Sequence, residues 1–291
     1  MSKNILITGS NGQIAHSLKL FFEDKDFNVR YTSLTPSVNN PLSLDLSLTD
    51  KCSYLFDNYD PDFIINTAGY TNVDHCENNK EKAHNVNVGI IKNILKFMSK
   101  KTKLIHISSD YIFDGKNTLY KEDSIPNPIN YYGKTKLESE NQIRSSNKKY
   151  IILRTGNLYS QFINLKSNRL SWIFNKLSKN ESIYAVEDMI SKPTNTCSIA
   201  PVILSLLPVS DNLIINYAGQ DSLSIYDFAV LVSKVFGFEK NLINRCKLKD
   251  IGFKAPRPKD VSLSTDFISE LINCNIYETE YCLKSIKSKL I

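Results

Sequence analysis

The chain has 291 residues, a net charge of +6 and 42% hydrophobic residues, which suits one large α/β unit or a nucleotide-binding domain with a smaller appended one. Its charges are spread along the chain and no apolar run reaches the length of a membrane span, so we expect no nucleic-acid partner and no membrane partner. The N-terminus lacks a signal-peptide layout, which predicts a cytoplasmic protein. The six cysteines and four histidines show no metal-ligand spacing, so we expect no metal.

The first predicted strand, residues 4–8, leads through a glycine turn into a helix whose apolar residues recur up to Phe22. Gly9, Gly12 and the small Ala15 form the pattern Gly-x-x-Gly-x-x-Ala at this junction. Glycine lets the backbone approach a pyrophosphate, and the start of a helix offers free N–H groups. The turn predicts a dinucleotide site that is formed by Gly9, Asn11, Gly12, Gln13 and Ile14.

A second strand is predicted over residues 27–31, and no acidic residue follows it where NAD would require one for the adenosine ribose. This absence favours NADPH, with NADH still possible, and Arg30 is the candidate contact for the 2′-phosphate. Alternatively, Arg30 faces solvent. Asp45 and Leu46 follow on an extended stretch, where the carboxylate could bind the adenine amino group or simply close a turn.

A third strand is predicted over residues 62–66, and small residues follow it. Ligands of open parallel sheets lie beyond the carboxyl ends of the strands. We therefore expect Ala68, Gly69 and Tyr70 to contact the cofactor. A loop that carries Thr71, Asp74 and Glu77 is expected near its nicotinamide end.

The next elements carry the candidate chemistry. A helix over residues 83–98 is followed by a strand over 104–107 that leads to Ser109, and a helix over 132–144 begins with Tyr132 and Lys136 on one face. Hydride transfer to a carbonyl creates an alkoxide, which a tyrosine phenol can protonate. A nearby lysine cation would lower the pKa of that phenol, and the hydroxyl of Ser109 could hold the substrate oxygen.

The remaining pattern indicates fold class and domain organisation. A fifth strand is predicted over residues 150–153, helices over 170–177, 199–206, 225–236 and 278–290, and a returning strand over 213–217. Alternating strands and helices predict an α/β fold with a doubly wound, mostly parallel Rossmann sheet. We expect an NAD(P)-binding domain over residues 1–155 and a smaller substrate-binding lobe over 156–291, with segments threading back. Trp172 lies in an apolar helical run and is expected in the core.

The chain resembles an extended short-chain dehydrogenase/reductase and, within that group, the dTDP-4-dehydrorhamnose reductase family. The segments Ser109-Asp-Tyr-Ile-Phe-Asp-Gly115 and Tyr132-Gly-Lys-Thr-Lys136 are fairly specific for this branch. Together with these two, the matching segments occur in family order across nearly the whole chain, at residues 8–14, 66–74, 107–115, 132–140, 153–159, 192–194 and 255–258.

This resemblance implies hydride delivery from NADPH or NADH to C4 of a nucleotide-linked 4-keto-6-deoxy sugar, with Ser109, Tyr132 and Lys136 as catalytic residues. It places Asn87 near the cofactor and Arg257 near the substrate diphosphate. The other residues that it assigns to the substrate site are Thr71, Asp74, Asp110, Tyr111 and Asn157. Asn157 stands where the family usually carries a tryptophan, which argues for a sugar other than the rhamnose precursor.

Two other functions remain open at this point. An epimerase or epimerase-reductase would use the same tyrosine and lysine. A regulatory subunit like that of methionine adenosyltransferase would bind cofactor and dock to another protein without turnover. A homodimer is possible in either case.

Overall fold

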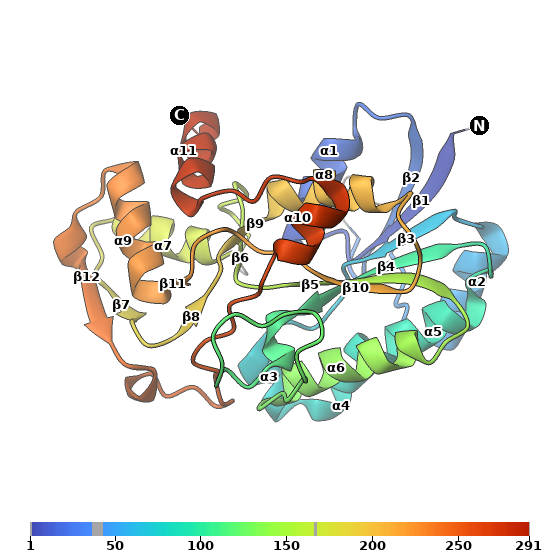
Figure 1. The fold of residues 1–291 in the computed structure, drawn as a ribbon, viewed down its shortest axis with the longest axis horizontal. Coiled ribbons are helices and arrows are strands. Elements are labelled where there is room, and N and C mark those ends of the chain that lie inside the picture. Colours follow the sequence, from blue (N-terminus) through green and yellow to red (C-terminus); the bar gives the residue numbers. More distant parts are fainter. Residues whose placement is uncertain (1, 37–42, 166–167, 291) are drawn as a thin grey trace.

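The computed structural model describes residues 2–36, 43–165 and 168–290. Six parallel strands form one sheet in the order β10-β5-β4-β3-β1-β2 (Figure 1). Their bounds are β1 Lys3–Thr8, β2 Phe27–Thr32, β3 Phe63–Asn66, β4 Lys103–Ser109, β5 Lys149–Thr155 and β10 Leu213–Asn216. The chain runs from β1 to β2 on one side and then crosses to β3 on the other, so a topological switch point lies between β1 and β3. The predicted doubly wound parallel sheet is confirmed.

Helices cover both faces of this sheet because its strands are apolar on both sides. Ile5 and Ile7 of β1 lie in one buried cluster with residues of α1 and α8, whereas Leu6 lies in another with residues of α2, α5 and α6. Successive side chains of a strand point to opposite faces, so one apolar run serves both cores. The helices are α1 Gln13–Phe22, α2 Thr49–Asn58, α5 Ile90–Phe97, α6 Tyr131–Arg144, α8 Thr196–Leu206 and α10 Asp266–Ile272.

The long helix predicted over residues 83–98 is interrupted. It consists of α4 (Lys80–His84), a π-helical turn η1 (Asn85–Gly89) and α5, which ends at Phe97. A second short helix, α3 (Val73–Asn78), precedes α4. A single π-helical turn inside an α-helix is typical of functional sites.

The smaller lobe lies beside the sheet and has a core of its own (Figure 1). Leu170, Phe228 and Leu283 are fully buried there, from three different helices. The lobe's elements are β6 Leu158–Tyr159, α7 Arg169–Leu177, β7 Ile183–Val186, β8 Ile190–Ser191, β9 Thr194–Asn195, β11 Leu223–Ser224, α9 Ile225–Phe236, β12 Ile243–Cys246 and α11 Thr279–Leu290. Three 3₁₀ turns complete the fold, η2 Asp110–Ile112, η3 Lys240–Leu242 and η4 Leu248–Asp250.

The later part of the chain also contributes to the sheet unit. β10 pairs with β5, and Thr196 of α8 bonds to Ser17 of α1 with 2.7 Å between the hydroxyl oxygens. The division at residue 155 stays a prediction. Among the described residues, no helix is long and apolar enough to cross a membrane, and no cluster of three or more His, Cys, Asp or Glu side chains could hold a metal ion.

Candidate active site

A cleft of about 1320 Å³ lies between the carboxyl ends of the strands and the lobe. This volume exceeds the 300–1,000 Å³ of a typical small-molecule site, so a dinucleotide and a second ligand can share it. Its walls come from the glycine turn, the segments after β2 to β5, the start of α6, and lobe residues that include Arg169, Trp172 and Tyr184.

The glycine turn has the geometry that a pyrophosphate site requires. Gly9 adopts φ +72°, and a Cβ there would lie 2.6 Å from the backbone of Ala68, so a side chain at this position is excluded. Gly12 begins α1 without a side-chain cap, and no acidic residue stands in the first turn of that helix. Free N–H groups and the positive end of the helix dipole therefore face the cleft. All five residues predicted for this site, Gly9, Asn11, Gly12, Gln13 and Ile14, line the cleft.

The residues at the end of β2 present hydroxyl groups to the cleft, whereas Arg30 does not line it. Thr32, Ser33 and Thr35 line the cleft, and the amide of Asn11 donates to the Thr35 hydroxyl at 2.9 Å. The guanidinium of Arg30 instead lies 4.3 Å from the centre of the Tyr59 ring. Arg30 does not line the cleft, and its role as the 2′-phosphate contact stays a prediction.

Asp45 and Leu46 line the cleft as expected. One carboxylate oxygen of Asp45 accepts from the backbone N–H of Ser47 at 3.0 Å and from its hydroxyl at 2.6 Å. Asp45 therefore closes a turn, one of the two roles considered for it.

The segment after β3 is held in place from behind by Asn87. Ala68, Gly69, Tyr70 and Thr71 line the cleft. Asn87, buried in the π-helical turn, accepts from the N–H of Tyr70 at 2.7 Å and donates to the hydroxyl of Thr135 at 2.8 Å. Asn87 does not itself line the cleft, so it fixes the position of Tyr70 relative to α6.

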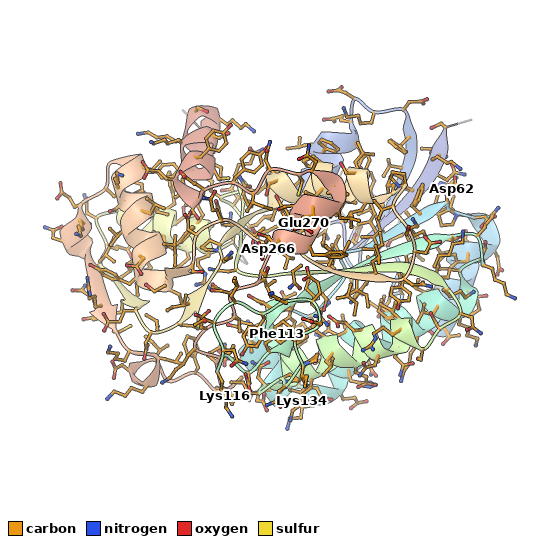
Figure 2. The ribbon with its side chains drawn as sticks, in the orientation of Figure 1. Asp62, Phe113, Lys116, Lys134, Asp266 and Glu270 are labelled. Atoms are coloured by element: carbon orange, nitrogen blue, oxygen red, sulfur yellow. The ribbon has the colours of Figure 1, made fainter. Side chains whose placement is uncertain are left out.

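Ser109, Tyr132 and Lys136 all line the cleft. Asn130 caps the start of α6 by accepting from the N–H of Gly133 at 2.8 Å, and a Cβ at Gly133 would meet the Tyr111 carbonyl oxygen at 2.1 Å. This close approach brings the first turn of α6 against the end of β4. Lys134, between the two candidate residues, is exposed on the outer side of the helix (Figure 2).

Lys136 belongs to a buried chain of polar groups. Its ammonium donates to the carbonyl of Ile107 at 2.6 Å and lies 3.3 Å from Nε2 of His106. His106 in turn contacts the amide of Asn66 at 2.9 Å, and Asn66 accepts from the hydroxyl of Thr8 at 2.5 Å. This chain links the ends of β1, β3 and β4 to α6.

Burial sets the acidity of these groups. It lowers the pKa of Lys136 to about 8, against the opposing charge of Glu140. Burial also raises the pKa of Tyr132, although a hydrogen bond with Ser109 opposes the shift. We expected the nearby lysine to lower the pKa of the Tyr132 phenol, but the groups of the protein itself raise it. The phenol keeps its proton at neutral pH and can donate it.

Asp110 lies directly behind Ser109 at the cleft wall. The Ser109 hydroxyl donates to its carboxylate at 3.1 Å, and a Cβ at Gly156 would collide with the same carboxylate. Burial raises the pKa of Asp110 to about 7, while the Ser109 hydrogen bond and the charge of Arg169 lower it. Tyr111, also in the cleft wall, packs edge-on against Tyr132 with 6.1 Å between ring centres.

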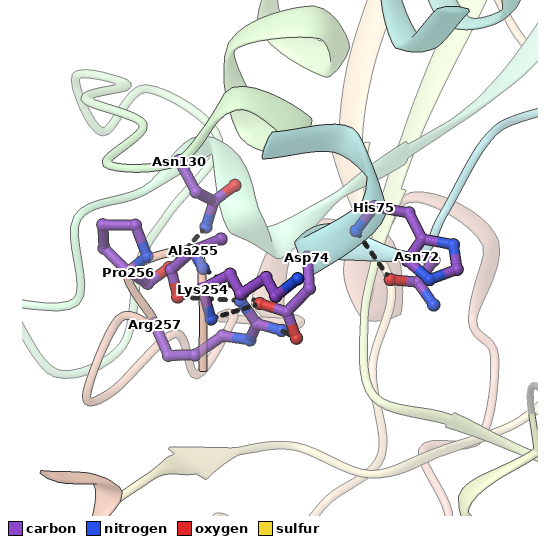
Figure 3. Close-up of polar contacts among 8 residues, drawn as sticks. All are labelled: Asn72, Asp74, His75, Asn130, Lys254, Ala255, Pro256 and Arg257. Atoms are coloured by element: carbon purple, nitrogen blue, oxygen red, sulfur yellow. Dashed lines mark hydrogen bonds and ion pairs between the residues drawn. The ribbon is translucent and has the colours of Figure 1, made fainter. Parts of the chain in front are cut away.

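Asp74 and Arg257 were both expected at the substrate, but the structure pairs them with each other (Figure 3). Asp74 lies in α3 and not in a loop, and its carboxylate accepts from Arg257 Nη2 at 2.9 Å and from the N–H groups of Lys254 and Ala255 at 3.0 and 2.9 Å. Neither residue lines the cleft. This contact holds the segment around Arg257 against α3. Glu77, also in α3, accepts from the N–H of Tyr131 at 3.0 Å.

The lobe side of the cleft differs most from the sequence prediction. Trp172 is 40% exposed and lines the cleft, so its expected core position is wrong. The buried stripe of α7 carries Leu170, Ile173 and Leu177, and position 172 lies beside that stripe. Asn157, at φ 47°, donates to the Ser191 hydroxyl at 2.7 Å. Arg169 was not predicted at all, since a lone arginine at a helix start carries no motif.

Comparison with known proteins shows the family to which the chain belongs. The model of the RmlD substrate binding domain family matches residues 3–290. A dTDP-4-dehydrorhamnose reductase from Aggregatibacter actinomycetemcomitans is 30% identical over 301 residues, which cover 98% of each chain. The methionine adenosyltransferase 2 subunit beta of Xenopus laevis is 27% identical over 279 residues, 93% of this chain and 83% of that protein.

A solved structure extends the agreement to the whole fold. The crystal structure of a dTDP-4-dehydrorhamnose reductase from Clostridium acetobutylicum superposes with a TM-score of 0.87 at 28% identity and covers 99% of both chains. The family resemblance predicted from the sequence is thus confirmed, and the chain belongs to the RmlD substrate binding domain family.

Proposed function

We propose that the protein is an NAD(P)-dependent reductase that delivers hydride from NADPH to the C4 keto group of a nucleotide-linked 4-keto-6-deoxy sugar. The observation that carries this proposal is the placement of Ser109, Tyr132 and Lys136 on the same cleft as the glycine turn. The two similar reductases named above support it.

Each residue of the cleft has a distinct role in this reaction. The turn at Gly9 and Gly12 receives the cofactor pyrophosphate, and the cofactor supplies the hydride. The Ser109 hydroxyl, which donates to Asp110 in the structure, turns its hydrogen to the substrate carbonyl oxygen. Tyr132 gives that oxygen its proton, which burial keeps on the phenol until then. Lys136 is fixed by Ile107 and His106, so its charge lies where a phenolate or a ribose hydroxyl can use it.

NADPH is the proposed cofactor because the cleft residues at the end of β2, from Thr32 to Thr35, carry hydroxyl groups and no acidic side chain. The hydroxyls of Thr32 and Thr35 can donate to a 2′-phosphate, which a carboxylate at these positions would repel. NADH remains the alternative. We further propose that residues 1–155 bind this cofactor, with the substrate held by lobe residues from 156–291.

The test is NADPH consumption with a panel of nucleotide-linked 4-keto sugars. We expect at least one member to be reduced with kcat/KM above about 10⁴ M⁻¹s⁻¹, and dTDP-4-dehydrorhamnose to be a poor substrate because Asn157 replaces the family tryptophan. Efficient reduction of dTDP-4-dehydrorhamnose would contradict the role given to Asn157. Isomerisation of a sugar nucleotide without net NADPH consumption would identify an epimerase instead.

A regulatory subunit is the second candidate, favoured by the similarity to the methionine adenosyltransferase 2 subunit beta. In that case the protein would bind NADPH, reduce no member of the panel, and co-sediment with a methionine adenosyltransferase. Reduction of any panel member would exclude a purely regulatory role.

A further inference from the structure

We infer that Arg169, and not Arg257, is the residue that binds the diphosphate of the substrate. This inference rests on the proposed function, since it identifies how a sugar nucleotide is held in the same cleft. The basic side chains among the described lining residues of the cleft are Lys82, Lys136 and Arg169.

Each basic side chain other than Arg169 has a defined contact. Lys136 is bound to Ile107, and the ammonium of Lys82 lies over the ring of Tyr70, 5.3 Å from its centre. Arg257 is already paired with Asp74. Arg169 forms no ion pair within 4 Å among the residues that the structure describes. Its Nη1 atom is buried there and has no hydrogen-bond partner.

A buried guanidinium nitrogen without an acceptor is costly, because it has lost water without gaining another partner. Asp110 and Tyr111 lie near enough to influence Arg169 electrostatically, yet neither bonds to it. An anion that enters the cleft would supply the missing acceptor.

Two other residues of the cleft have the same property, which marks the cleft as a binding surface. The hydroxyl of Thr155 and the side-chain carbonyl of Asn157 are buried without partners, and both residues line the cleft. A sugar presents hydroxyl groups that could satisfy both atoms. A hydrogen-bond donor for an anion and two atoms suited to hydroxyls thus line the same cleft.

The substrate has one group that fits the guanidinium. Neither a 4-keto-6-deoxy sugar nor a nucleobase carries negative charge at neutral pH, so the anion must be the diphosphate. Arginine binds such groups through two parallel charged hydrogen bonds. The proposed site of the cofactor pyrophosphate is the turn at Gly9 and Gly12, where the start of α1 offers free N–H groups.

The experiment is a binding titration of the full-length protein with UDP and dTDP, compared with UMP and dTMP. Saturating NADP⁺ is present throughout, so that nucleotides cannot enter the cofactor site. The variants are Arg169→Met, which removes the charge, and Arg169→Lys, which keeps the charge but loses the paired donors. The exposed Arg144→Gln is the matched control for the loss of one positive charge.

We expect Arg169→Met to weaken binding of the diphosphate by about 10- to 100-fold, the range for hydrogen bonds to charged groups. Arg169→Lys should lie between it and the wild type, Arg144→Gln should match the wild type, and NADP⁺ affinity should stay unchanged. Unaltered diphosphate binding by Arg169→Met would overturn the inference while leaving the proposed function intact. Equal losses of diphosphate and NADP⁺ affinity would also overturn it, by showing a structural role. A wild type that binds neither diphosphate would contradict the proposed function itself.

Discussion

The two walls of the cleft differ in how their polar groups are satisfied. On the sheet side, Lys136, His106 and Asn66 bond to one another and to the backbone before any ligand arrives. By contrast, Thr155 at the end of β5, and Asn157 and Arg169 in the lobe, each keep a buried polar atom without a hydrogen-bond partner. We infer from this difference that the chain of groups around Lys136 is organised in advance for a constant reaction, and that the groups around Asn157 and Arg169 are completed by the substrate.

The largest effect on activity is expected at Tyr132, on the sheet side. Tyr132→Phe removes only the phenolic oxygen, so the alkoxide must take its proton from water. We expect kcat to fall by roughly 10²–10⁴-fold while the dissociation constant for NADPH stays nearly unchanged. Tyr131→Phe, on the neighbouring residue, should retain wild-type turnover. Wild-type kcat in Tyr132→Phe would exclude this residue as the proton donor.

The second prediction tests whether the sheet side depends on its internal contacts for stability. Glu140 and Arg154 form a buried pair with N···O distances of 2.8 and 3.1 Å and side-chain exposures of 0% and 2%. Glu140→Gln leaves the guanidinium without its counter-charge and should lower the free energy of unfolding by about 3–5 kcal/mol, measured by urea denaturation. Glu138→Gln removes a pair that is 40% exposed on the Glu138 side and should cost less than about 1 kcal/mol. Equal losses of unfolding free energy in both variants would show that the buried pair contributes no more to stability than the exposed one.

The third prediction concerns pH and Asp110, which lies where the two walls meet. Its pKa is raised from 3.8 to about 7 in the folded protein, so the folded state binds more protons than the unfolded state between these values. The stability that the protonated carboxyl provides is complete below pH 3.8 and is lost as pH rises through 7. Asp110→Asn should remove this part of the decline. Urea denaturation at several pH values checks it, and identical pH profiles for the two proteins would contradict the assignment.

The smallest effect is expected at Trp172, on the lobe side. Because the indole is 40% exposed at the cleft, Trp172→Ala should change the free energy of unfolding little. It should raise KM for the sugar nucleotide by about 2- to 10-fold through the loss of aromatic contact. Leu177→Ala, in the buried stripe of the same helix, provides the contrast, because it should destabilise the fold by about 2–5 kcal/mol. A large stability loss in Trp172→Ala with unchanged KM would show that the indole packs in the core and does not contact the substrate.

Much of the sheet side could be predicted from sequence because its signals are local. Ser109 follows a strand, Tyr132 and Lys136 are one helical turn apart, and Gly9 lies where a strand meets a helix. Each conclusion needs only the period of an element and the residue at its end. These residues line one cleft because parallel strands end at the same edge of a sheet.

The contacts that the sequence did not indicate join distant parts of the chain. Asp74 and Arg257 satisfy each other across 183 residues, which no local pattern indicates. The same limit applies to Asn87, whose amide supports Tyr70 from behind and does not line the cleft.

The sequence by itself therefore determined the alternation of elements, the glycine turn and the face of α6 that carries the candidate chemistry, because these depend on backbone geometry and side-chain period within short segments. Only the tertiary structure decided which polar groups are already paired and which are left for a ligand. That property depends on burial and on contacts between segments far apart in sequence. It separates Arg257, which Asp74 neutralises, from Arg169, which retains a buried nitrogen without an acceptor.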